Sequence, residues 1–97
     1  MLHIINKSPF SKNSLESCIR VAPKDDPILL TEDAVLGAMS GSSVAALVKD
    51  AQKNHAIYAL SADIKARNVD RLVDGVKVID YNGFVELVEQ HRTMSWL

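Results

Sequence analysis

Cys18, the only cysteine of the 97-residue sequence, is the residue with the clearest capacity for covalent chemistry. A thiolate can carry sulfur or attack an electrophile, and a nearby cation or a helix N-terminus favours it by lowering the pKa of the thiol. Arg20 lies two residues away, and side chains at that spacing do not face each other on a helix. Leu15, Cys18 and Ile19 instead follow the spacing of one apolar helical face. We therefore predict that Cys18 is buried, with a sulfur carrier at Cys18 as the alternative.

The histidines and a glycine–serine segment do not complete a catalytic or ligand-binding motif. His3, His55 and His91 are far apart and no second cysteine accompanies them, so the sequence predicts no metal site. Residues 41–43, Gly-Ser-Ser, lack the second glycine and the lysine of a phosphate-binding P-loop, and they predict a helix cap. The motifs of dinucleotide-binding proteins and of serine hydrolases are also missing, so we predict no cofactor.

Short apolar runs alternate along the chain with segments of helical spacing. The apolar runs predict four strands, at residues 2–5, 28–31, 56–60 and 76–80. The helical spacing predicts helices at residues 12–22, 34–39, 44–51, 64–67 and 82–91, with a further brief helix around residues 69–73. Capping side chains are expected at the helix starts: Asn13, Asp33, Ser42 or Ser43, Asp63 and Asn82. Residues 93–97 form a tail that is polar first and then mostly apolar.

Strands that alternate with helices are typical of a mostly parallel sheet with both faces covered. We predict a single domain over residues 1–97 with a small three-layer α/β/α fold. The strand that holds Lys77 is expected at an edge of the sheet, where a lysine is tolerated. Ligands bind beyond the carboxyl ends of the strands in such folds. A site would thus be built from four loops, at residues 6–8, 31–33, 61–63 and 80–82.

The charge of the chain argues against direct contact with nucleic acid, because 11 basic and 12 acidic residues give a formal net charge of −1 and no basic stripe. The first nine residues show no basic region followed by a long apolar one, so we expect no signal peptide. No apolar run is long enough to cross a membrane, and we predict no membrane partner. A single cysteine fits a reducing compartment, and we predict a cytoplasmic protein.

Several short stretches of the sequence form a set whose order and spacing are informative. The set spans nearly the whole chain: MLH at 1–3, SP at 8–9, LL at 29–30, DAV at 33–35, YAL at 58–60 with Asp63, AR at 66–67, IDY at 79–81, FVEL at 84–87, His91 and Trp96. In order and spacing it resembles the TusB/DsrH family of sulfur-relay proteins. The strongest parts of the resemblance are the first ten residues and residues 56–96.

The resemblance implies a DsrE-like α/β fold and a role as one subunit of a larger complex. It implies partners that are TusC-like and TusD-like, assembled with this chain as a dimer of heterotrimers. Such a complex takes persulfide sulfur from TusA and passes it to TusE, for 2-thiolation of the tRNA wobble uridine. The related DsrEFH complexes serve sulfur oxidation. The principal sulfur-carrying cysteine belongs to the TusD-like subunit, so we predict a non-catalytic subunit.

Four apolar residues are candidates for the subunit interface: Phe10, Met94, Trp96 and Leu97. Tryptophan is enriched at interfaces, and exposed apolar patches mark binding surfaces. The alternative for Trp96 is that it folds back and packs within its own chain. Two alternatives remain for the function: an active sulfur carrier through Cys18 in a DsrEFH-like complex, or a stand-alone α/β module that binds a small ligand.

Overall fold

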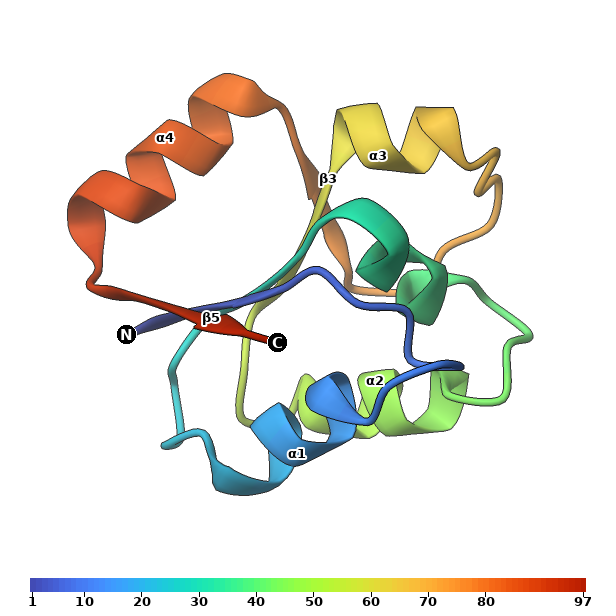
Figure 1. Ribbon diagram of the computed structural model, residues 1–97, viewed down its shortest axis with the longest axis horizontal. Helices are drawn as coiled ribbons and strands as arrows, with labels where there is room; N and C mark the ends of the chain where they lie inside the picture. The colour runs from blue at the N-terminus through green and yellow to red at the C-terminus, as the bar shows by residue number, and fades with distance from the viewer.

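The computed structural model describes residues 1–97 and contains one five-stranded sheet (Figure 1). Its strands are β1 (Leu2–Ile5), β2 (Ile28–Leu30), β3 (Ile57–Leu60), β4 (Lys77–Ile79) and β5 (Thr93–Trp96). All neighbouring strands are parallel, and their order across the sheet is β4-β3-β2-β1-β5. The central strands are rich in isoleucine and leucine, which suit strands covered on both faces.

Helical segments connect the strands. They are α1 (Ser14–Val21), the 3₁₀ segment η1 (Glu32–Ala38), α2 (Ala45–Ala51), α3 (Ser61–Ala66) and α4 (Tyr81–Gln90). None of these helices is both long enough and apolar enough to cross a membrane. The alternation of strands and helices confirms the predicted three-layer α/β architecture.

The direction of the connections decides which face of the sheet each helix covers. From β1 to β4 the chain steps across the sheet in one direction, so right-handed crossovers place their helices on one face. The last crossover, from β4 to β5, runs back across the whole sheet in the opposite direction. The same handedness therefore places α4 on the other face, opposite α1 and α2 (Figure 1).

The two cores differ in size because of this arrangement. The larger core holds 15 buried residues, including Leu15 of α1 and Val48 of α2. The smaller core consists of Leu2, Leu29 and Leu87, with partly buried side chains around them. A single ten-residue helix thus supplies most of the cover for the second face of a five-stranded sheet.

The structure corrects several details of the sequence-based prediction. β5 was not predicted, and it forms by pairing with β1 in register from Leu2–Thr93 to Ile5–Trp96. The brief helix predicted around residues 69–73 is absent, because Val69 and Val73 enter the core from irregular backbone and Leu72 forms an isolated bridge with Met39. The edge position of Lys77 is confirmed.

Most of the predicted capping side chains were wrong. Asp80, not Asn82, caps α4, and its Oδ1 accepts a hydrogen bond from the Gly83 amide at 2.9 Å. The residues at the N-caps of α1, η1, α2 and α3 make no side-chain cap bond. Ser42 remains close to its predicted role, since its hydroxyl accepts from the Val44 amide at 3.3 Å just before α2. Asp33 and Asp63 lie inside η1 and α3, and their side chains make contacts between these two segments.

Candidate functional site

Cys18 lies on the inner face of α1 and is fully buried, as its helical spacing predicted. Its side chain belongs to the larger core together with Leu15 and Ile5. Burial, with a smaller contribution from the negative charge of Asp26, raises the pKa of the Cys18 thiol from 9.0 to about 12. The thiol therefore stays protonated near neutral pH, in a place that solvent does not reach.

A polar network surrounds the start of β1. The indole Nε1–H of Trp96 donates to Nδ1 of His3 at 3.1 Å, which leaves the His3 proton on Nε2. That Nε2 donates to Oδ2 of Asp26 at 2.9 Å, and this hydrogen bond lowers the pKa of Asp26. His55 donates through Nδ1 to the backbone oxygen of Asp26 at 2.8 Å. The network ties β5 to β1 and to the loop before β2.

Two of the three histidines, His3 and His55, thus have structural partners within one network. His3 and His55 are both buried, at 4% and 6% exposure. His91 lies apart from them, at the C-cap of α4. In the structure no three histidine, cysteine, aspartate or glutamate side chains form a group suited to a metal ion.

Two of the four predicted loops meet at the carboxyl ends of β2 and β3. Asp63 Oδ2 accepts from the amide of Glu32 at 2.8 Å. Arg67 donates to Asp33 Oδ1 at 2.8 Å and to Asp63 Oδ1 at 3.4 Å. Asp33 and Asp63 therefore both have Arg67 as a cationic partner, so these two carboxylates join η1 to α3.

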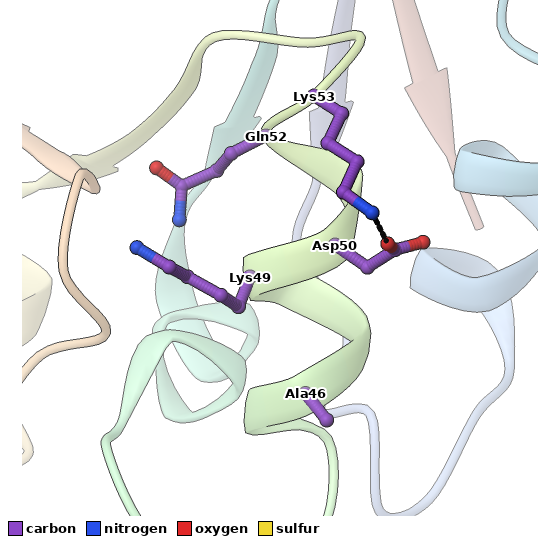
Figure 2. Close-up of a pocket in the computed structure, with 5 residues that line it drawn as sticks. All are labelled: Ala46, Lys49, Asp50, Gln52 and Lys53. Atoms are coloured by element: carbon purple, nitrogen blue, oxygen red, sulfur yellow. Dashed lines mark ion pairs between the residues drawn. The ribbon is translucent and has the colours of Figure 1, made fainter.

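The largest surface hollow lies over α2 rather than at the strand ends, with a volume of about 530 Å³. Figure 2 shows its five lining side chains on α2 and the turn that follows it: Ala46, Lys49, Asp50, Gln52 and Lys53. Lys53 pairs with Asp50 at 2.9 Å, and Lys49 and Gln52 both donate to the Asp74 carbonyl. The polar groups around this hollow are satisfied within the chain, and they do not converge on a ligand.

The candidate interface residues occupy different environments. Phe10, Met94 and Leu97 are exposed, at 53%, 43% and 88%. Trp96 is partly buried against the larger core, in addition to its hydrogen bond with His3. The backbone oxygen of Leu97 accepts from the Ser14 hydroxyl at 2.8 Å, which fixes the end of β5 to the start of α1. Their role in an interface stays a prediction.

An additional apolar surface on α4 was not predicted. Tyr81, Val88 and the partly buried Phe84, which packs against the smaller core, recur at a spacing that places them along one side of the helix, and we call them the α4 patch. Tyr81 is 70% exposed and Val88 is 40% exposed, whereas Leu87 beside them is buried against the sheet. The apolar stripe of α4 is thus wider than its contact with the sheet. The sequence shows this stripe, but only the strand order reveals that one helix spans the whole face.

Comparisons with known proteins agree with this fold. The family model described as DsrH like protein matches residues 7–94. A protein named TusB from Serratia proteamaculans (strain 568) is 37% identical over 99% of this chain and 100% of its own length. The TusB protein of Buchnera aphidicola subsp. Baizongia pistaciae (strain Bp) is 36% identical over the same shares.

Two solved structures share the architecture at low sequence identity. The crystal structure of the ychN protein from E. coli aligns with a TM-score of 0.84 at 17% identity, covering 98% of this chain and 97% of its own. A protein of unknown function, MTH1491 from Methanobacterium thermoautotrophicum, aligns with a TM-score of 0.74 at 17% identity, covering 97% and 95%. The two structures share the fold alone, whereas the family model and the TusB relatives match nearly the whole sequence, so the chain belongs to the TusB/DsrH family of sulfur-relay proteins.

Proposed function

We propose that this chain is a non-catalytic subunit of a TusBCD-like complex, which relays persulfide sulfur from TusA to TusE for 2-thiolation of the tRNA wobble uridine. Family membership implies a subunit role, and the partners in this proposal are TusC-like and TusD-like chains in a dimer of heterotrimers. The single observation that supports the non-catalytic role best is the complete burial of the only thiol, Cys18.

Persulfide relay makes demands that Cys18 does not meet. The acceptor thiolate attacks the outer sulfur of a persulfide, the sulfur–sulfur bond breaks, and the donor cysteine leaves as a thiolate. The acceptor must therefore be ionised and within reach of another protein. Cys18 is neither, because it is buried and its pKa is about 12. The sulfur chemistry in this proposal belongs to the cysteine of a partner subunit.

The subunit role also accounts for the exposed apolar side chains. Parallel sheets normally have both faces well covered, and here α4 covers one face alone. The α4 patch is suited to a neighbouring subunit that would complete this cover. The second proposed contact surface consists of Phe10, in the turn after β1, with Met94, Trp96 and Leu97 at and after β5. In this proposal the complex is cytoplasmic, and other proteins make the contact with tRNA.

Co-expression tests the subunit role. We expect this chain to purify together with TusC-like and TusD-like chains from the same genome. Val88→Arg should reduce the amount of partner recovered at least about tenfold, because a desolvated charge at an interface costs several kcal/mol. Glu86→Arg, on the opposite side of α4, is the matched control, and it should leave recovery unchanged. Circular dichroism checks that both variants remain folded. A wild-type chain that fails to co-purify would contradict the subunit role.

A second test addresses the site of the chemistry. We expect a complex that carries Cys18→Ala to keep sulfur transfer within about twofold of wild type, because alanine removes the thiol and leaves only a small cavity. The measurements are the 2-thiouridine content of tRNA and a mass increase of one sulfur atom on each subunit after exposure to a persulfide donor. An assembled Cys18→Ala complex that transfers no sulfur, or a wild-type chain with sulfur added at Cys18, would support the active-carrier alternative instead.

A further inference from the structure

The two edges of the sheet differ in their protection against pairing with another strand. Proteins protect free edges with charged side chains, prolines, bulges or covering helices. β4 carries the exposed Lys77, whose ammonium group lies 5.6 Å from the centre of the Tyr58 ring. β5 reads Thr-Met-Ser-Trp, without charge or proline, and its first three residues are exposed. The edge formed by β5 is therefore the unprotected one.

The backbone geometry identifies the groups that face outward from β5. The amide of Leu2 donates to the oxygen of Arg92 at 2.6 Å, so the peptide groups of Arg92 point toward β1. In a strand, the hydrogen-bonding groups of successive residues alternate between the two sides. The backbone N–H and C=O groups of Met94 therefore also point toward β1. Those of Thr93 and Ser95 point outward. No other strand of the chain lies beyond them.

We propose that β5 pairs antiparallel with β5 of a second copy of this chain, with Ser95 opposite Ser95, so that the two sheets become continuous. A two-fold axis perpendicular to the sheet places the same face of both sheets on the same side. Two residues that lie opposite each other must therefore have their side chains on the same face. Centring the pair on Ser95 satisfies this rule and joins the outward groups of both copies. It places Met94 opposite Trp96 and Thr93 opposite Leu97.

The second copy fits this edge better than a charged peptide segment does. Every side chain in the paired region is uncharged, so the self-pairing places no like charges opposite each other. Met94 would contact the Trp96 indole of the second copy, a favourable sulfur–aromatic contact. Leu97, 88% exposed in the single chain, would gain a neighbour in Thr93. Four-residue strands bury little area, so the dimer of the isolated chain is weak and depends on concentration.

This contact is separate from the proposed hetero-subunits, because it uses only the edge strand of this chain. It assigns Met94 and Leu97 of the second contact surface to another copy of the same chain, and it leaves the α4 patch for homologous partners. The test therefore uses the isolated full-length chain, and its outcome is distinguishable from a failure of co-purification.

Disulfide trapping tests both the contact and its register. Opposed residues in a hydrogen-bonded antiparallel pair have Cα atoms about 5.5 Å apart, within the range that a disulfide spans. Under mild oxidation we expect Ser95→Cys to form at least about tenfold more cross-linked dimer than Val78→Cys on the other edge strand. The buried Cys18 contributes no competing thiol. Stronger cross-linking by Met94→Cys than by Ser95→Cys would overturn the register, and equal yields from Ser95→Cys and Val78→Cys would overturn the contact.

A proline variant tests the hydrogen bonds directly. Ser95→Pro removes only an outward N–H, which an edge strand tolerates. We expect it to weaken dimerisation at least about tenfold, because two symmetric hydrogen bonds are lost at about 1 kcal/mol each. Analytical ultracentrifugation over a concentration series measures the association, and the melting temperature checks that the fold is retained. Dimerisation of a folded Ser95→Pro chain at wild-type strength would overturn the proposed pairing.

Discussion

Iodoacetamide should alkylate Cys18 at least about a thousandfold more slowly in the folded chain than in the same chain unfolded in urea. The thiolate is the species that reacts. Its pKa rises from 9.0 to about 12 on folding, so each folded molecule holds about a thousandfold less thiolate at neutral pH. Burial of the side chain slows the reaction further. Mass spectrometry of intact protein sampled over time measures both rates, and Cys18→Ala supplies the unreactive control.

The same pKa shift makes the fold sensitive to alkali. Above pH 9 the unfolded thiol loses its proton while the folded thiol keeps it, so ionisation favours the unfolded chain. Up to pH 12 the free energy of unfolding should fall by about 1 to 1.5 kcal/mol per pH unit more in wild type than in Cys18→Ala. Urea titrations at several pH values measure this difference. Rapid native alkylation, or equal alkaline sensitivity of the two chains, would contradict a buried neutral thiol.

Trp96→Ala should lower the free energy of unfolding by about 3 kcal/mol, although Trp96 lies on an edge strand. The indole packs against the larger core, and removing it opens a gap there. The substitution also deletes the hydrogen bond to Nδ1 of His3, a side chain only 4% exposed. A buried acceptor without a partner costs about 1 to 3 kcal/mol.

Two further variants separate these contributions. Trp96→Phe keeps most of the packing and loses only the hydrogen bond, so we expect a loss of about 1 kcal/mol. Leu97→Ala removes an exposed side chain next to it, and the expected change is below about 0.5 kcal/mol. Urea unfolding measures all three. A Trp96→Ala chain as stable as wild type would show that the indole serves an interface alone.

The local pattern of apolar residues in the sequence was sufficient to predict much of this fold. β1 begins and ends where its apolar run predicts, and the predicted bounds of the other three strands exceed the observed ones by one or two residues. The inner strands β1, β2 and β3 are recognisable because they are covered on both faces and need continuous apolar sequence. The burial of Cys18 was predicted for a similar reason, since helical spacing places it beside Leu15.

The remaining features depend on contacts between distant parts of the chain. β5 has an exposed, mixed sequence that carries no strand pattern, and it exists because β1 offers a free edge. Val69 and Val73 have helical spacing, yet they lie on irregular backbone, and their side chains pack into the larger core. The α4 patch could not be predicted either. Its exposure follows from the long return crossover to β5, and strand order is not readable from periodicity.

The pairing of β1 with β5 has a consequence for how the chain folds. Trp96 and His3 are 93 residues apart in sequence and are bonded in the folded chain. Contacts of such long range are slow to form, because the intervening chain must be ordered before they bring any stabilisation. Until residues 93–96 arrive, β1 is itself a bare edge strand. A nascent chain lacking this last strand would expose Leu2 to Ile5 to aggregation, so folding is complete only once the first and last strands have met.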